Sequence, residues 1–191
     1  MVNPYTYILQ CKKAEATPAK TALQDAFLAL AHRKPYASIG VSELCAKAHV
    51  ARTTFYANYP NTAALLAEIE DGLIADLMQV NDHKRNHTQA SEEYATFMHN
   101  AEQFIERHRE PLYTMLVVQP DNGLIEKWKT GVKFHFWDVF QRERTASGEF
   151  GLEMVASIAL AGYTYLLKNP KEFDMNEMLR MLNAASEVIQ Y

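Results

Sequence analysis

The chain has 191 residues, 48% of them hydrophobic and 22% charged, which is expected for a soluble globular protein with a sizeable core. No segment approaches the roughly 18 to 20 uninterrupted apolar residues that a membrane span needs, so no membrane partner is expected. No basic run precedes the apolar stretch 5–9, so the N-terminus does not resemble a signal peptide. Cys11 and Cys45 form neither a metal motif nor a disulfide framework, and a reduced, cytoplasmic setting is expected.

The charge is unevenly distributed around a formal net value of −4 at pH 7. Residues 1–60 hold seven Lys and Arg against three Asp and Glu (7 − 3 = +4), and the remainder holds twelve against twenty (12 − 20 = −8). A basic segment joined to an acidic body fits a head that faces DNA on a body that does not touch it. Chance asymmetry explains these numbers equally well without a motif.

Helical periodicity dominates, and no run shows sustained strand alternation, which predicts an all-α fold of about nine helices. Thr17 and Pro18 are expected to start the first helix, Asn61 to cap a long one, and 120–123 and 147–148 to be breaks. The expected helices cover 18–34, 41–48, 51–58, 61–80, 91–108, 111–118, 124–144, 149–168 and 175–190.

Helices 41–48 and 51–58, joined by a tight turn at His49 and Val50, predict a helix-turn-helix. Its small core is expected to consist of Val41, Leu44, Cys45, Ala48, Val50 and Phe55. The second helix would present Arg52, Thr53, Thr54 and Tyr56, which suit contacts with phosphates and base edges. The spacing alone also permits a helical hairpin with a polar face.

The stretch 44–59, LCAKAHVARTTFYANY, followed by Pro60 and Leu65–Leu66, resembles the signature of the TetR family. The resemblance covers about residues 18–75, and its most specific part is Thr54-Phe55-Tyr56 with Tyr59. It implies a dimeric repressor that binds a palindromic double-stranded DNA operator and is released by a small apolar or aromatic effector. The DNA-binding residues expected on this basis are Lys47, Arg52, Thr53, Thr54, Tyr56 and Tyr59.

Four positions depart from the pattern common in the family: Gly40, His49, Ala51 and Thr62. Ala51 cannot cap the second helix with its side chain, and Thr62 lacks the charge that usually meets a phosphate. His49 would have to adopt a left-handed conformation, which is uncommon for histidine. We expect these departures to weaken operator binding and leave the fold unchanged.

The polar run 81–89 predicts a boundary between a head at 1–60, with 61–80 as connecting helix, and a ligand-binding and dimerisation domain at 81–191. The second part is rich in large, soft side chains that could line a pocket for an apolar or aromatic effector. Taken singly, each of these residues is more often plain core. The expected ligand-binding residues are Phe97, His99, Phe104, Tyr113, Trp128 and Phe136.

Helix 149–168 is apolar on more than one face, which indicates burial on both sides. Paired with helix 175–190 and with their copies, it predicts a four-helix interface in a homodimer. A buried intramolecular helix is the rival interpretation. The expected interface residues are Val155, Ala159, Gly162, Tyr163, Leu166 and Leu182.

Other chemistries find little support in the sequence. His83 and His87 have a spacing that can bind a metal on a helix, but a solvated loop is the better interpretation, so no metal or cofactor is expected. There is no catalytic triad, phosphate loop or paired carboxylates, which argues against an enzyme. A ligand-dependent co-regulator that acts mainly through a protein partner remains the alternative to a DNA-binding repressor.

Overall fold

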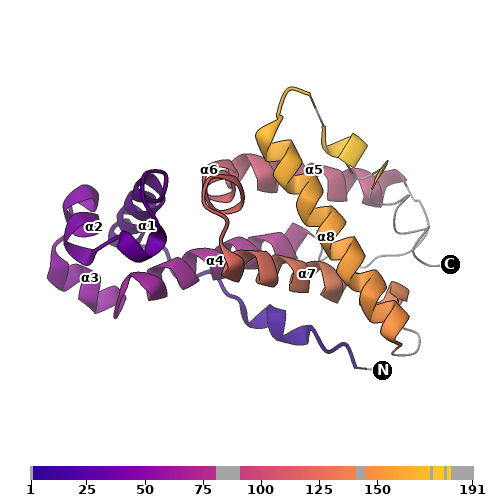
Figure 1. Cartoon of the computed structure of the whole chain (residues 1–191), viewed down its shortest axis with the longest axis horizontal. Coiled ribbons are helices and arrows are strands. Elements are labelled where there is room, and N and C mark those ends of the chain that lie inside the picture. Colours follow the sequence, from indigo (N-terminus) through magenta and orange to yellow (C-terminus); the bar gives the residue numbers. More distant parts are fainter. Residues whose placement is uncertain (1, 81–90, 141–144, 173, 179, 182–191) are drawn as a thin grey trace.

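The computed structural model describes residues 2–80, 91–140, 145–172, 174–178 and 180–181, with backbone alone at 91–98 and 138–140. Every regular element in these ranges is helical, which confirms the all-α prediction. Figure 1 shows an elongated molecule in which a small head joins a larger helical body through one long helix. The elements are η1 (Thr6–Gln10), α1 (Pro18–Ala31), η2 (Tyr36–Ser38), α2 (Val41–Ala48), α3 (Arg52–Asn58), α4 (Thr62–Val80), α5 (Ser91–Arg107), α6 (Arg109–Tyr113), η3 (Thr114–Val118), α7 (Asn122–Phe140) and α8 (Ala146–Lys168).

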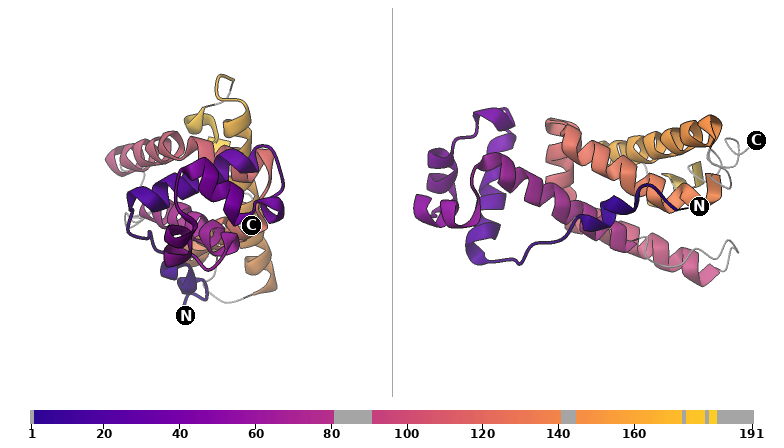
Figure 2. Two further views of the ribbon diagram at one scale, coloured as in Figure 1. Left: turned by 90° about the vertical axis from the view of Figure 1, so that its left-hand side faces the viewer. Right: turned by 90° about the horizontal axis from the view of Figure 1, so that it is seen from below.

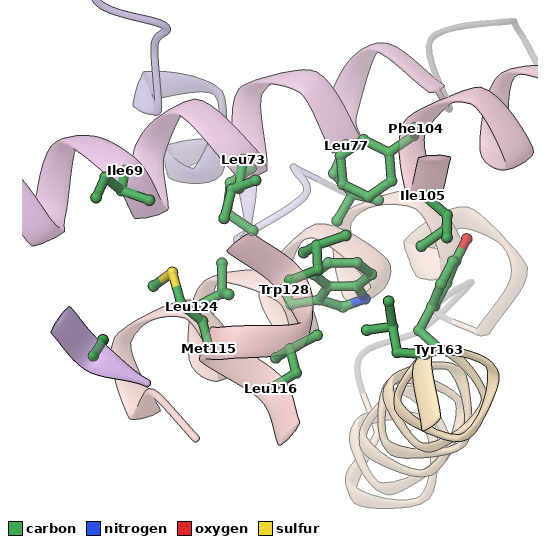
Figure 3. Packing of buried hydrophobic residues seen from close by; sticks show 14 of the residues in the cluster. Ile69, Leu73, Leu77, Phe104, Ile105, Met115, Leu116, Leu124, Trp128 and Tyr163 are labelled. Atoms are coloured by element: carbon green, nitrogen blue, oxygen red, sulfur yellow. The ribbon is translucent and has the colours of Figure 1, made fainter. Parts of the chain in front are cut away.

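The helix α4 belongs to both parts of the molecule. Its first turns pack against the head, and its later turns present Leu73 and Leu77 to α5 and α7. Figure 3 shows these side chains facing Phe104 and Trp128 across the centre of the body. One continuous apolar cluster therefore connects head and body.

An N-terminal arm, residues 2–17, precedes the head and packs along the body. Figure 2 shows it running from α1 beside α4 to α7. Ile8 of η1 is buried, and Asn3 Nδ2 donates to the Phe134 carbonyl at 3.0 Å. The sequence predicts no element here and places these residues with the head, whereas the bonds of Asn3 and Tyr5 reach α7 and α8 of the body.

Side-chain caps shift two of the predicted breaks: residues 120–121 form a break as expected but 122–123 are helical, and 147–148 lie inside a helix. Asp121 Oδ1 accepts from the Leu124 amide at 2.7 Å, so α7 begins at Asn122 inside the expected turn. Thr145 Oγ1 accepts from the Gly148 amide at 3.1 Å, so α8 includes the expected break at 147–148. A capped first turn tolerates glycine because its amides are bonded outside the helix ladder.

The helix predicted over 111–118 is also different. It begins earlier, as α6, and continues as the π-helical turn η3, in which the Gln119 amide donates to the Thr114 carbonyl at 2.8 Å. The first helix ends at Ala31, three residues before the expected end. Asp174 caps the start of the last expected helix, as predicted, by accepting from the Glu177 amide. The rest of that helix, from residue 182, lies outside the described residues.

The 23-residue helix α8 is long and apolar enough to cross a membrane by length and composition. Leu152, Val155 and Ala159 are nevertheless buried against the rest of the body. Packing inside the protein therefore accounts for one face of α8, while Phe150 and Tyr165 remain exposed on another.

Candidate nucleic-acid interface

Helices α2 and α3 are held at a fixed angle by a small shared core. Leu44, Cys45 and Phe55 are buried, and Phe27 of α1 packs beneath them in the same cluster. Phe55 points inward, as expected, and leaves the opposite side of α3 at the surface. This packing makes the three helices of the head a rigid support for that surface.

The turn between α2 and α3 depends on His49. Its backbone has φ 54° and ψ 36°, and it is the one non-glycine residue with positive φ among those described. The Val50 amide closes the end of α2 by donating to the Cys45 carbonyl at 3.0 Å. The left-handed conformation expected for His49 is therefore confirmed. It carries a conformational free-energy cost that a glycine at this position would avoid.

The outer face of α3 carries most of the predicted DNA-binding residues. Arg52, Thr53 and Tyr56 are exposed, as is Lys47 at the end of α2, and Thr54 is half-buried. The Tyr56 side chain is 52% exposed, and its ring lies edge-on to Phe55 at 5.4 Å. Lys47 and Arg52 give this face positive charge, and no described part of the body covers it (Figure 1).

Tyr59 lies elsewhere than the resemblance implied. It is only 2% exposed, and its hydroxyl donates to Glu68 Oε1 at 2.6 Å. Burial, and then the bond to Glu68, raises the pKa of Tyr59 well above its usual value. A buried hydroxyl that already donates to a carboxylate cannot reach a DNA phosphate, so Tyr59 acts in the head as a structural residue.

Glu68 of α4 connects the head to this helix through hydrogen bonds and an ion pair. Besides Tyr59, it accepts from Lys20 Nζ at 2.7 Å and from Gln24 Nε2 at 3.0 Å, both on α1. Lys20 also lies over the Tyr59 ring, 5.5 Å from its centroid. These contacts fix the direction in which α3 projects from α4.

A second joint, centred on Gln119, connects the head to the body. Its Oε1 accepts from the Tyr36 amide at 2.8 Å, and its Nε2 donates to the Ala31 and Lys34 carbonyls at 3.1 Å each. The Tyr36 hydroxyl donates to the Gln119 carbonyl at 2.8 Å. The π-helical turn η3 directs Gln119 at the head, and such turns often occur at functional positions.

A hydrogen-bonded pair adds to this joint. His32 Nε2 lies 2.7 Å from Thr114 Oγ1, and that hydroxyl donates its only hydrogen to the Glu110 carbonyl. His32 Nε2 is therefore the donor. Sequence reasoning missed Gln119, Thr114 and Glu68, because their partners are distant in the chain and follow no spacing pattern.

The expected ligand-binding residues differ in their surroundings. Phe104 and Trp128 are buried and packed together, with ring centroids 5.8 Å apart, and Phe136 is also buried. Tyr113 is half-buried, and His99 is exposed and bonded to Gln103. The Phe97 side chain lies outside the described residues. Neither of the two cavities described in this structure touches this set.

One polar atom in that cluster stands out. Trp128 Nε1 is buried and has no hydrogen-bond partner among the described residues. Tyr163 packs against the same indole at 5.0 Å, and burial raises the pKa of its hydroxyl to about 12. Figure 3 shows both rings filling the space between α5, α7 and α8. They serve as core in this conformation.

The residues expected at the dimer interface largely face inward. Val155, Ala159, Tyr163 and Leu166 are buried within the single chain. A Cβ on Gly162 would lie 2.7 Å from Met178 Cγ, so this glycine lets the segment after residue 174 approach α8. Leu182 lies outside the described residues. The surface of α8 that remains open carries Phe150, Ser157, Ala161 and Tyr165 instead.

Among the described residues, no group of three or more His, Cys, Asp or Glu could hold a metal ion. His83 and His87 lie outside this part of the chain.

Comparison with known proteins identifies the head. Residues 23–69 match the family model described as "Bacterial regulatory proteins, tetR family", and this segment is a TetR-family helix-turn-helix. The match runs from α1 through α3 and into α4, as far as Ile69, and so includes Glu68. No curated protein matches the chain.

Proposed function

We propose, from the tetR-family helix-turn-helix at residues 23–69, that this protein is a transcriptional regulator that reads double-stranded DNA with α3. The observation that carries the proposal is the exposed face of Arg52, Thr53 and Tyr56 on a rigid three-helix support. Arg52 is suited to hydrogen bonds with a guanine edge or a phosphate. Thr53 and Thr54 are suited to contacts with phosphates or a thymine methyl, and Tyr56 to a hydrogen bond with the DNA backbone. Lys47 would add a phosphate contact.

We propose that the regulator acts as a homodimer on a palindromic operator. Two copies of α3 would then lie about 34–36 Å apart, one turn of B-DNA. The open face of α8 supports this arrangement, because Phe150 is 66% exposed and Tyr165 is 50% exposed. Between them Ser157 and Ala161 line a shallow cavity of about 400 Å³ against α7. Small residues beside exposed rings suit a helix from a second copy.

We further propose that an effector releases the protein from DNA, which makes it a cytoplasmic repressor. The two joints at Glu68 and Gln119 support such coupling, because they connect the head to α4 and to η3 of the body. An effector that binds one arrangement of these joints better than another would shift the equilibrium between DNA-binding and released forms.

The DNA-binding function is tested with the purified full chain and a labelled fragment from upstream of its own gene. Fluorescence anisotropy at low salt should show specific binding that Arg52→Ala and Tyr56→Ala each weaken by about 5- to 100-fold. Arg107→Ala is the matched control, because Arg107 is exposed on the body. Wild-type affinity in both head variants would refute the assignment. Absence of specific binding would favour the co-regulator that works through a protein partner.

The dimer is tested separately by analytical ultracentrifugation. Ala161→Arg places a charge at the centre of the open face of α8 and should give a monomer with unchanged helicity. Lys171→Ala, also exposed, should leave the dimer intact. A wild-type chain that is already monomeric, or an Ala161→Arg variant that still dimerises, would overturn this interface.

A further inference from the structure

We infer that the effector binds between the N-terminal arm, α4 and α7, and that it is an amphipathic anion such as an aromatic or aliphatic carboxylate. This inference rests on the proposed regulatory function. A cavity of about 520 Å³ lies at this place, within the size range of small-molecule sites. Its apolar lining includes Leu9, Met78 and Phe134, its cationic lining consists of Lys12 and Lys13, and His135 also borders it.

The arm forms one wall of this cavity and is anchored on both sides of it. Upstream, Tyr5 donates to Glu149 Oε2 at 2.7 Å, its ring packs edge-on against Trp137, and Ile8 is buried. Downstream, Lys13 Nζ lies 2.8 Å from Asp76 Oδ2 on α4. The segment between these anchors therefore crosses the cavity, with Leu9 at its edge and 54% exposed.

The charges around the cavity favour an anion. None of its lining residues is Asp or Glu. The carboxylates that act on its lining residues have cationic partners: Asp76 is paired with Lys13, and Glu70 and Asp71, which both raise the pKa of Cys11, are paired with Lys127. Lys12 forms no ion pair within the described part of the chain. Its ammonium group is thus available to a carboxylate, whose apolar remainder would cover Met78 and Phe134.

The position of the site explains how an occupant would reach the head. The arm leads directly to Thr17, which caps α1 by accepting from the Lys20 amide. Lys13 joins the arm to Asp76, and Asp76 also contacts His108 at the end of α5. A ligand anion beside Lys12 and Lys13 would compete with Asp76 for the lysine and alter the contact between arm and α4.

The probe for this site is 8-anilinonaphthalene-1-sulfonate, an aromatic sulfonate that fluoresces on apolar surfaces. Titration without DNA should show saturable binding of one probe per chain. Lys12→Glu should weaken it at least about fivefold, because attraction becomes repulsion. Ala75→Trp should abolish it by filling the cavity. Lys171→Glu is the matched control, with the same charge change at a remote exposed site.

A local readout ties the signal to this cavity. Cys11 lines it, so the bound probe should slow the alkylation of Cys11 by iodoacetamide at pH 9 in the wild type and not in Lys12→Glu. Melting curves show whether Ala75→Trp is folded, and Lys12→Glu carries the test alone if it is not. Equal affinity in Lys12→Glu, Lys171→Glu and the wild type would overturn the site, as would unprotected Cys11.

The effector role is tested apart from the site. The probe should lower the affinity of the wild-type protein for its promoter fragment at least about threefold. Probe binding with the expected variant pattern but unchanged DNA affinity would refute the effector role. A protein that binds no DNA at all would refute the proposed function, while the probe titration, which contains no DNA, would still decide the site.

Discussion

Replacing Gln119 with alanine should loosen the head from the body. The side chain makes three hydrogen bonds to the segment 31–36, one accepted from the Tyr36 amide and two donated to carbonyls. The alanine variant loses all three, while the bond from the Tyr36 hydroxyl to the Gln119 carbonyl can remain. Glutamate at this position can accept one of the three bonds but cannot donate the other two.

The size of the effect follows from these bonds. Each contributes a net of about 0.5–1.5 kcal/mol, so three contribute about 1.5–4.5 kcal/mol. Gln119 is half-buried and water can replace part of the loss, which places the expected cost of Gln119→Ala at about 1.5–3 kcal/mol. For a chain of this size, in which 1 kcal/mol shifts Tm by about 2–4 °C, that corresponds to a fall in Tm of roughly 3–12 °C.

Scanning calorimetry measures the change in Tm, and hydrogen exchange at the Tyr36 amide reports the joint itself. Gln119→Ala should accelerate exchange at Tyr36, and Gln119→Glu should not restore wild-type protection, because its carboxylate would face the Ala31 and Lys34 carbonyl oxygens. Gln103→Ala is the control, because Gln103 is exposed on α5. A Gln119→Ala protein with the wild-type Tm and unchanged Tyr36 protection would show that this joint does not hold the head.

Three further predictions concern single side chains. Tyr59→Phe removes the bond to Glu68 and should lower the free energy of unfolding by about 1–3 kcal/mol in urea titration, with DNA affinity unchanged. Gly162→Val would press on Met178 and should cost about 1–3 kcal/mol by overpacking. Burial and Asp71 raise the pKa of Cys11 from 9.0 to about 11, so iodoacetamide should modify it about 100-fold more slowly at pH 8 than in the unfolded chain, with rates rising until about pH 11.

If Tyr59→Phe weakened DNA binding as much as Tyr56→Phe, Tyr59 would have to be a DNA-contacting residue. Ala67→Val, at an exposed position of α4, makes a similar change in a helix and should leave stability nearly unchanged, so equal losses at 67 and 162 would contradict the close approach of Met178. Cys11 peptides alkylated as fast in the native as in the unfolded protein would show that the thiol is not shielded.

The helix-turn-helix could be predicted because its determinants are local. The caps at Thr17 and Asn61 and the left-handed turn at His49 each involve residues three to five positions apart. Local signals failed where a second local signal opposed them. Asp121 started α7 inside a segment whose Pro and Gly indicated a turn, because a bonded cap outweighs the small cost of glycine in a first turn.

The rest of the site depends on contacts that spacing cannot reveal. Tyr36 and Gln119 are 83 positions apart, and Tyr5 and Glu149 are 144 apart. The burial of Tyr59 is decided by Glu68 and Lys20, which come from two other helices. A short motif therefore predicts which surface would face DNA, but it does not predict which of its aromatic residues is buried in the core of the head.

Because α4 is long, a small rotation at its body end produces a larger displacement of the head. Its 19 residues span about 28 Å at 1.5 Å each, with the head at one end and the arm cavity near the other. A tilt of about 5° at the body end would sweep the head through roughly 2 Å. In a symmetric dimer the displacements of the two heads add or cancel according to their direction. A tilt of α4 too small to disturb the packing of the body can therefore move the two α3 helices out of register with DNA by more than a hydrogen bond tolerates.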